Sequence, residues 1–305
     1  MNHLVSQHIF TAMKWTLQNR YLQWSTMAVL ALVWGSSFIL MKRGLEYYSN
    51  FEVASLRIFF ASVVMLPLGM RYFRKVHSKH YFPIFWVGFF GNFLPAYLFT
   101  TAQTVLPSSL SGMLNSMVPI FTLIMGVILF KSKTKQKSFF GVVLGFIGAI
   151  GLVVAQSGFS FGSNLSYYPL LIVIATLCYA SSVNVIKYYL GNVSPLAITS
   201  IAFMFIGPFS LVYLLFNSTQ FLQTFTVDAI PPLIYIAVLG IVGTAIAVLL
   251  FNALIKETTA IFASSVTYLI PVVALGWGLV DGEMITSAQM AFMGLLLGGV
   301  YLVKN

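Results

Sequence analysis

The stretch Trp34-Gly35-Ser36-Ser37-Phe38-Ile39-Leu40-Met41-Lys42 has a second version further along the chain, Tyr179-Ala180-Ser181-Ser182-Val183-Asn184-Val185-Ile186-Lys187. The two stretches lie 145 residues apart (187 minus 42). A second group of residues recurs at an offset of 152 residues (286 minus 134). Its members Gly88, Gly91, Phe99, Pro119, Leu123, Gly126 and Thr134 match Gly240, Gly243, Phe251, Pro271, Leu275, Gly278 and Thr286. The sequence therefore predicts that one structural unit occurs twice.

The composition predicts a protein whose solvent is the lipid bilayer. Of the 305 residues, 59% are hydrophobic and only 7% are charged. A soluble protein carries about 25% charged residues, and no soluble fold of this length could bury so much apolar surface. The single cysteine, Cys178, excludes an internal disulfide and a cysteine-based metal cluster. We expect it to be a small buried hydrophobic residue.

Ten hydrophobic stretches are long enough to cross a bilayer as helices. They are residues 24–43, 53–70, 81–101, 108–130, 138–156, 167–187, 195–216, 231–253, 258–280 and 286–303. Five spans fall in a first copy, residues 24–156, and five in a second copy, residues 167–303, with a Gly- and Ser-rich linker at 157–166. An odd number of spans turns the second copy upside down. We therefore predict an all-α integral membrane protein of ten transmembrane helices in two inverted five-helix repeats, as in many secondary transporters.

The net charge of +10 predicts the orientation in the membrane rather than a nucleic-acid partner. With the N-terminus in the cytoplasm, most basic residues fall on the cytoplasmic side: Lys14, Arg20, Arg71, Arg74, Lys75, Lys79, Lys131, Lys133, Lys135, Lys137, Lys187, Lys256 and Lys304. Only Lys42, Arg43 and Arg57 lie at or near the outer side. This is the positive-inside bias. We predict a multi-pass protein of the cell (inner) membrane, with residues 1–23 as a cytoplasmic tail, no signal peptide, and both termini cytoplasmic.

The sequence lacks the motifs of common enzyme sites. It contains no His-Glu-x-x-His, no Walker loop and no pair of cysteine ligands. The histidines, His3, His8, His77 and His80, fall in the tail or the first basic loop. The acids, Glu46, Glu52, Asp228, Glu257, Asp281 and Glu283, map to loops or to the ends of spans. We expect no metal site, no cofactor and no enzymatic activity.

The distribution of acids also bears on the transport mechanism. An ionisable side chain inside the membrane usually marks an ion pathway or a proton relay. A proton-driven exporter of cationic drugs would need a buried carboxylate, and no carboxylate or histidine lies near the middle of any predicted span. Cationic multidrug antiport is therefore disfavoured, and transport is expected not to depend on a protonatable side chain at the midplane.

Two basic residues, Arg57 and Lys42, are candidates for an outer gate. Arg57 lies about one turn into the second predicted span. One interpretation is an arginine that extends to the outer surface and pairs with Glu52 or Glu46. The other is a contact for an anion or carboxylate at the outer gate. Lys42 ends its span, which favours the first interpretation more strongly.

Polar and aromatic residues near the middle of the spans form the candidate substrate site. Polar groups are costly in lipid without partners, so they should face the protein interior. The candidate substrate-binding residues are Trp34, Ser37, Asn92, Asn115, Tyr179, Asn184, Asn252 and Tyr268, with Ser36, Thr244 and Thr267 as further polar residues. Each alone could instead form an interhelical hydrogen bond. Together they suit a small zwitterion with an apolar or aromatic side chain, bound among the first, third, fourth, sixth, eighth and ninth spans.

Glycines and prolines add two structural expectations. Gly141 and Gly145, like Gly294 and Gly298, are spaced to let helix backbones approach in lipid, so the fifth and tenth spans are assigned to scaffold. Pro119 and Pro271 lie near the middle of the fourth and ninth spans. Each is expected to kink its helix, either for packing or as a hinge beside the cavity.

These motifs resemble a known family. Leu32-Val33-Trp34-Gly35-Ser36-Ser37-Phe38 with Lys42, followed by Ser55-Leu56-Arg57-Ile58, is similar to the opening of EamA-type members of the drug/metabolite transporter superfamily. Tyr268-Leu269-Ile270-Pro271-Val272-Val273 and Gly282-Glu283-Met284-Ile285-Thr286 resemble its second-copy signature. The resemblance covers residues 24–303 and implies ten helices, alternating access and transport of small metabolites, often amino acids. Where the family's first copy commonly has Gly-Glu, this chain has Phe130-Lys131.

The sequence thus predicts a secondary transporter that moves small metabolites, with amino acids favoured, outward by alternating access. The expected partners are a small-molecule substrate and the lipid bilayer, and a monomer is expected. The alternative substrate class is a nucleotide sugar or another organic anion, which would require several basic residues in the cavity. A lipid-modifying enzyme would require clustered acids, histidines or a metal site, and a purely structural membrane protein would bind no substrate.

The predicted orientation can be tested by labelling single cysteines from outside intact cells, in a variant whose Cys178 has been replaced. Ser163→Cys lies in the predicted outer linker and should react with an impermeant maleimide, whereas Lys133→Cys should not. Strong labelling at position 133 together with protection at position 163 would reverse the orientation.

Overall fold

The fold was analysed in a computed structural model that describes residues 19–132, 136–156, 167–217 and 226–304. Throughout these ranges the chain is built from helices and turns, without β-strands. Most of the predicted N-terminal tail and the whole predicted linker at 157–166 lie outside the described residues. The all-helical expectation is therefore confirmed for the described part of the chain.

The first half of the chain supplies five helical segments. The first, second and fifth are continuous helices, and the third and fourth are interrupted. The first two are α2 (Arg20–Leu45) and α3 (Asn50–Phe73). The third segment comprises η1 (Ser78–His80), α4 (Tyr81–Gly88), η2 (Phe89–Phe93) and α5 (Leu94–Ala102). The fourth comprises α6 (Ser108–Asn115) and α7 (Val118–Phe130), and the fifth is α8 (Gln136–Gln156).

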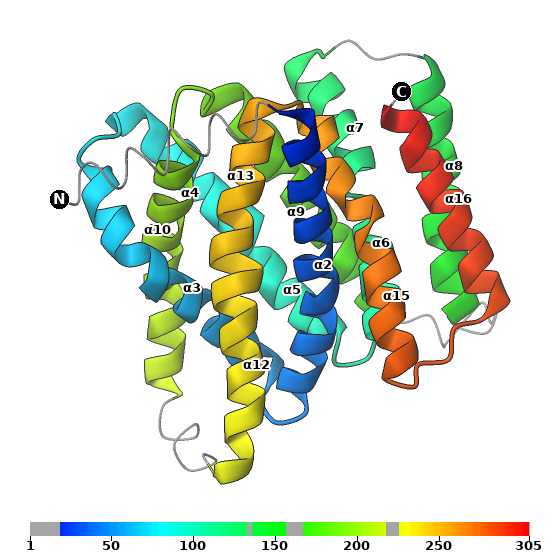
Figure 1. The fold of residues 1–305 in the computed structure, drawn as a ribbon, viewed down its shortest axis with the longest axis horizontal. Helices are drawn as coiled ribbons and strands as arrows, with labels where there is room; N and C mark the ends of the chain where they lie inside the picture. The colour runs from blue at the N-terminus through cyan, green and yellow to red at the C-terminus, as the bar shows by residue number, and fades with distance from the viewer. Residues whose placement is uncertain (1–18, 133–135, 157–166, 218–225, 305) are drawn as a thin grey trace.

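The second half repeats this order of continuous and interrupted helices. The continuous helices are α9 (Tyr168–Tyr189) and α10 (Pro195–Phe216). The eighth segment comprises η3 (Val227–Ala229), α12 (Ile230–Gly240), η4 (Ile241–Ile246) and α13 (Ala247–Glu257). The ninth comprises α14 (Ala260–Ser264), η5 (Ser265–Tyr268) and α15 (Ile270–Val280), and the tenth is α16 (Ser287–Lys304). Figure 1 shows α8 and α16 side by side at one edge of the bundle.

Within the described residues, nine helical segments are long and apolar enough to cross a membrane. α16 is a shorter apolar helix, and it packs against α8. Many large apolar side chains along the segments face outward, including Phe139 and Phe140 on α8 and Leu215 and Phe216 on α10. An apolar exterior is expected where lipid is the solvent. The structure thus bears out the integral-membrane character.

The third and eighth segments each contain a wide π-helical turn at the same repeat position. The turns begin at Phe89 and Ile241, which are 152 residues apart (241 minus 89). In each turn a polar side chain donates to the carbonyl five residues back: Asn92 Nδ2 to Val87 O at 3.5 Å and Thr244 Oγ1 to Leu239 O at 2.9 Å. Wide turns of this kind are rare and often occur at functional sites. They rotate the following residues of each segment relative to a regular helix.

The fourth and ninth segments are interrupted rather than kinked. α6 ends at Asn115 and α7 begins at Val118, while η5 separates α14 from α15. Pro119 and Pro271 therefore lie in the first turn of the second half-helix. A proline is tolerated there because the amide hydrogen it lacks would have no helical partner. The Ser116 hydroxyl donates to the Thr267 carbonyl at 2.9 Å, so the two interruptions contact each other.

Close packing of α8 against α16 depends on glycine, though on a different residue of α16 from those predicted. A Cβ at Gly299 would lie 2.4 Å from the Gly145 nitrogen and 2.6 Å from the Gly141 oxygen. A Cβ at Gly298 would have only Leu144 nearby, at 3.8 Å, and a Cβ at Gly294 would meet no heavy atom within 4 Å. The expected role of Gly141 and Gly145 in backbone contact is seen, and its partner is Gly299, because the helix phase turns Gly294 and Gly298 away.

We expect Gly299→Ala to destabilise the protein, because the added methyl group would overlap the α8 backbone. Overpacking of this kind typically costs about 1–3 kcal/mol. The measurement is the melting temperature in detergent. Gly294→Ala is the matched control on the same helix, since its methyl group would meet open space. Equal melting temperatures for the two variants would contradict the inferred α8–α16 contact.

Candidate functional site

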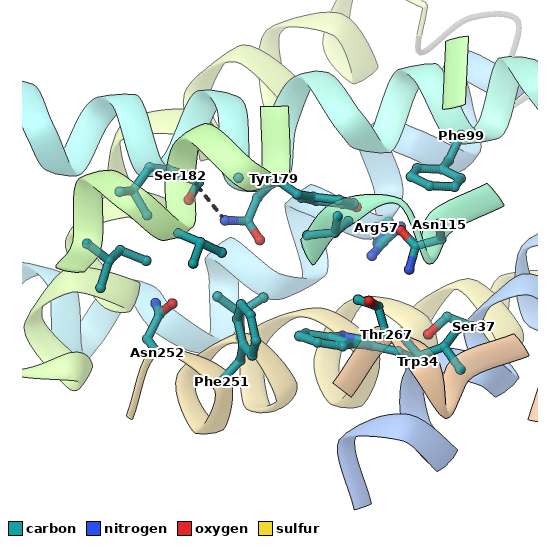
Figure 2. A pocket seen from close by; sticks show the side chains of 18 of the residues that line it. Trp34, Ser37, Arg57, Phe99, Asn115, Tyr179, Ser182, Phe251, Asn252 and Thr267 are labelled. Atoms are coloured by element: carbon teal, nitrogen blue, oxygen red, sulfur yellow. Dashed lines mark hydrogen bonds between the residues drawn. The ribbon is translucent and has the colours of Figure 1, made fainter. Parts of the chain in front are cut away.

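A central cavity of about 100 Å³ lies between the two halves of the chain (Figure 2). Residues from both halves line it: Trp34, Ser37, Phe38, Met41, Arg57, Val87, Gly91, Asn92, Phe99, Asn115, Val118, Tyr179, Ser182, Val183, Ile186, Val248, Phe251, Asn252, Thr267 and Ile270. All six segments that the sequence analysis placed around a cavity contribute, and α3 adds Arg57. α8 and α16 contribute no lining residue.

Two aromatic pairs form the cavity walls, and the repeat relates one pair to the other. Trp34 packs edge-on against Phe251, with ring centroids 5.0 Å apart. Tyr179 stacks on Phe99 at 6.0 Å. Trp34 matches Tyr179 at the offset of 145, and Phe99 matches Phe251 at the offset of 152. Each half of the chain therefore supplies one ring to each pair.

Glycines in the two π-helical turns let each turn lie close to a serine of the other half, and Gly91 also lines the cavity. A Cβ at Gly91 would lie 2.4 Å from the Ser182 hydroxyl, and a Cβ at Gly243 would lie 3.0 Å from the Ser37 hydroxyl. The Trp34 indole donates to the Gly243 carbonyl at 3.0 Å. These contacts fix the position of the Trp34 ring against the turn at Ile241–Ile246.

Three asparagine amides reach the cavity from different segments. Asn252 is anchored by a hydrogen bond from its Nδ2 to the Thr199 hydroxyl at 2.9 Å. Asn92 bonds to its own wide turn. The Asn115 side chain forms no hydrogen bond with the described residues, although Asn115 is only 6% exposed. The Asn115 amide is thus available to a ligand.

Arg57 is a basic residue of the cavity wall rather than of the outer surface. It follows the first residue of α3, Asn50, by seven positions, which is about 10 Å along a helix. Its Nε donates to the Thr244 hydroxyl at 2.7 Å. Neither predicted acid pairs with it, because both have other partners. Glu46 pairs with Arg43 at 2.5 Å, and Glu52 forms a capping box with Ser49 at the start of α3.

Lys42 lies outside the cavity, in an ionic group that we call the Lys42 cluster. The cluster consists of Lys42, Arg43, Asp281, Glu283 and the first residues of α6. Lys42 Nζ lies 2.5 Å from Asp281 and 3.1 Å from Glu283, and Arg43 also bonds to Asp281. Glu283 accepts hydrogen bonds from the Ser108 amide at 2.9 Å and the Ser109 amide at 3.1 Å. The cluster ties the end of α2 to the end of α15 and the start of α6.

The hydrogen bonds of the Lys42 cluster favour the ionised form of Glu283. Burial acts to raise the pKa of its carboxyl, but hydrogen bonds from Ser109, Ser108 and Lys42 outweigh burial and hold the pKa at about 2. The Glu283 side chain is 7% exposed, so these bonds are shielded from water. A charged carboxylate at the start of α6 also complements the helix dipole.

The corresponding site at the opposite end of the molecule has no carboxylate. Gly282 has a φ of +78° and Lys131 has a φ of +51°, so these two residues occupy the same left-handed position after their helices. Lys131-Ser132, rather than the expected Phe130-Lys131, is therefore the counterpart of Gly282-Glu283. Lys187, the repeat match of Lys42, donates to the carbonyls of Ile255 and Thr258 instead of pairing with an acid.

Two predicted site residues, Asn184 and Tyr268, do not line the cavity. Asn184 Nδ2 donates to the carbonyls of Thr122 at 3.1 Å and Ala180 at 2.9 Å. The Tyr268 hydroxyl donates to the Val300 carbonyl at 2.9 Å. Both links hold helices together, which is the alternative role that the sequence analysis gave to such residues. Trp34, Ser37, Asn92, Asn115, Tyr179 and Asn252 do line the cavity.

Some lining residues were missed as candidates although the repeat itself points to them. Ser182 matches Ser37, and Phe251 matches Phe99. Thr267, named above only as a further polar residue, matches Asn115 at the offset of 152 (267 minus 115). Applying the two offsets to the candidates would have identified Ser182 and Thr267, whereas Phe99 and Phe251 match each other and neither was a candidate.

We expect Glu283→Gln to lower the melting temperature in detergent at pH 7, by an amount equivalent to about 1–2 kcal/mol. The pKa of Glu283 is depressed, so its stabilising contribution is present above its ordinary pKa of 4.5 and is lost as the pH falls toward 2. The difference from the unsubstituted protein should therefore shrink between pH 7 and pH 3. Asp228→Asn, at an exposed position, is the control. A constant difference across this pH range would contradict the assignment.

Comparison with known proteins identifies the family. The EamA-like transporter family matches the chain twice, over residues 23–154 and 166–304. A solved structure titled "Crystal structure of protein" has a similar fold, with a TM-score of 0.63 and 17% identity over 91% of this chain and 95% of that one.

Curated relatives are similar along nearly their whole length. An uncharacterized transporter of Archaeoglobus fulgidus is 26% identical over 92% of this chain and 98% of its own. A protein of Salmonella typhimurium named "Probable amino-acid metabolite efflux pump" is 25% identical over 90% of this chain and 92% of its own. An uncharacterized inner membrane transporter of Escherichia coli is 27% identical over 90% of this chain and 88% of its own. With its apolar helices and duplicated match, this chain is a multi-pass membrane protein that belongs to the EamA-like transporter family.

Proposed function

We propose that this chain is a secondary transporter that exports small metabolites, with amino acids as the best-fitting class. The observation that carries the proposal is the cavity between the two matched halves, which combines aromatic walls with buried amide groups that line it. Aromatic rings suit an apolar side chain. The oxygen of a side-chain amide can accept hydrogen bonds from an ammonium group, and its NH2 group can donate to a carboxylate. The relative named as an amino-acid metabolite efflux pump supports both the substrate class and outward transport.

The size of the cavity also favours a substrate as small as an amino acid. An engineered cavity of about 150 Å³ holds benzene, so a cavity of about 100 Å³ has room for a small ligand or for part of one. A nucleotide sugar is much larger than an amino acid and carries two phosphate groups, whereas Arg57 is the single basic residue among the described residues that line the cavity.

Alternating access is supported by the matched arrangement of the two halves. We propose that they are inverted repeats and that α16 completes ten transmembrane helices. The interrupted helices at Ser116–Met117 and Ser265–Tyr268 contact each other beside the cavity, where small backbone rotations would open one end or the other. With both termini in the cytoplasm, the Lys42 cluster closes the outer end. The cytoplasmic end lacks an equivalent ionic group among the described residues.

A second candidate, the transport of organic anions, is favoured by one observation. Arg57 lines the cavity and forms no ion pair with any of the described residues. A small monocarboxylate would supply that missing charge. Both candidates share a carboxylate and differ in whether an amino group is required.

The experiment that tests the proposal is counterflow in proteoliposomes. Vesicles loaded with unlabelled leucine should accumulate labelled leucine, and labelled glucose and nucleobases should not be exchanged. Tyr179→Ala should reduce counterflow because it removes one ring of the wall, whereas Tyr188→Ala, on the same helix outside the cavity lining, should not. Absence of exchange for every amino acid and small carboxylate tested would refute the proposal.

We further expect that a pH gradient alone does not drive uphill transport. The described residues that line the cavity include no Asp, Glu or His. Proton coupling normally requires a group whose pKa changes between the inward-open and outward-open forms. The measurement is accumulation in proteoliposomes with an imposed pH gradient at zero membrane potential. Uphill accumulation that is abolished by replacing one acid, such as Glu257 or Glu283, would contradict this expectation.

A further inference from the structure

We propose that Arg57 binds the carboxylate of the substrate and makes the carrier selective for net charge. This inference rests on the proposed function, because it assumes that the central cavity is the substrate site. It goes further by naming the chemical group that the site recognises. It also predicts which charged analogues with one shared apolar group the site accepts.

The position of Arg57 leaves most of its hydrogen-bonding capacity directed at the cavity. Within the described part of the chain its one hydrogen bond runs from Nε to the Thr244 hydroxyl, at 2.7 Å. Figure 2 shows Arg57, Asn115 and the ring of Tyr179 gathered at one end of the cavity, with Asn252 toward the other. The terminal guanidinium nitrogens form a planar fork that matches the two oxygens of a carboxylate. The Thr244 bond holds this fork in place from behind.

No acid of the protein can compensate the charge of Arg57, and all six acids lie in the described part of the chain. Glu46, Asp281 and Glu283 are bound to Lys42 or Arg43. Glu52 caps α3. Asp228 lies exposed in η3 and Glu257 ends α13. None of the six lines the cavity. A charge held in low dielectric without a partner is costly, so an anionic ligand gains from neutralising it.

Arg57 breaks the symmetry of an otherwise matched site. Its repeat match at the offset of 145 is Ala202. The backbone surroundings of the two are alike: a Cβ at Gly240 would lie 2.7 Å from the Arg57 oxygen, and one at Gly88 would lie 3.0 Å from the Ala202 oxygen. The two walls therefore offer similar aromatic and polar surfaces, while a cation exists on one side only. A bound carboxylate is thereby directed toward Arg57, which orients the substrate.

The single charge leads to a ranking of ligands. A monoanion neutralises Arg57 completely. A zwitterion also does so, but its ammonium must rely on neutral acceptors such as the Asn92 and Asn115 amides. A monocation meets repulsion from the guanidinium and gains no ion pair. A dianion leaves its second carboxylate without a cationic partner in the cavity lining.

The experiment measures affinity for four ligands that share the isobutyl group of leucine, by calorimetry with the full-length protein in detergent. The ligands are 4-methylpentanoate, leucine, leucinamide and isobutylsuccinate. In the unsubstituted protein we expect 4-methylpentanoate and leucine to bind, isobutylsuccinate to bind more weakly, and leucinamide to bind weakest. Arg57→Gln should weaken the monoanion by about 30-fold or more, because it leaves a desolvated carboxylate unpaired. It should leave leucinamide unchanged or tighter.

Two further variants separate charge recognition from damage to the fold. Arg57→Lys keeps the charge and loses the planar fork, so it should retain the preference for the acid over the amide at reduced affinity. Arg74→Gln makes the same substitution as the first variant at an exposed position just after α3 and should change nothing. Thermal unfolding of each variant confirms that it is folded.

The outcomes distinguish the inference from the function on which it rests. Leucine counterflow that proceeds equally in Arg57→Gln, with the acid still preferred over the amide, would overturn the role of Arg57 and leave the proposed transport of amino acids standing. Failure of all four ligands to bind or exchange in the unsubstituted protein would overturn both. The inference would be supported if Arg57→Gln lost the preference for 4-methylpentanoate over leucinamide and Arg57→Lys kept it.

Discussion

The architecture depends on backbone-to-backbone contact between the two halves at matched glycines. Gly88 rests against the Ala202 carbonyl and Gly240 against the Arg57 carbonyl, at distances that leave no room for a side chain. In lipid there is little hydrophobic drive to bring helices together, so such close contacts and interhelical hydrogen bonds contribute much of the association. Because the same contact occurs twice, the two halves meet around a shared space. The cavity is a consequence of this packing.

The wide turns next to these glycines give the cavity its polar character. Each turn releases a carbonyl from regular helix geometry, and Asn92 or Thr244 bonds to that carbonyl. The same turn brings Gly91 or Gly243 against a serine of the facing half and, in the second half, provides the carbonyl that holds Trp34. Thr244 in turn supports Arg57. Irregular backbone in a membrane is tolerated where it is buried in protein or lines a cavity, as it does here.

Charge is distributed unevenly over this symmetric frame. The Lys42 cluster uses two acids and two bases at one end, where they bond to the start of α6. At the other end Ser132 occupies the place of Glu283, and Lys187 bonds to neutral carbonyls. Among the described residues, an ionic cluster thus forms at one end only, and Arg57 is the one cation of the cavity lining and has no acidic partner. In a two-fold frame such differences distinguish one end of the molecule from the other and one side of the cavity from the other.

The sequence by itself determined what depends on composition and on periodic pattern. The apolar content required a lipid environment, and the two offsets revealed the duplication. Polar and aromatic residues near the middle of the spans pointed to Trp34, Ser37, Tyr179 and three asparagines of the cavity. The tertiary structure decided what depends on the direction of each side chain. Asn184 and Tyr268 turn to neighbouring helices, Gly299 replaces Gly298 in the α8–α16 contact, and Arg57 faces the cavity. A wide turn or an interrupted helix shifts the phase of all that follows, so hydropathy locates a span but not the side of the helix from which a residue points.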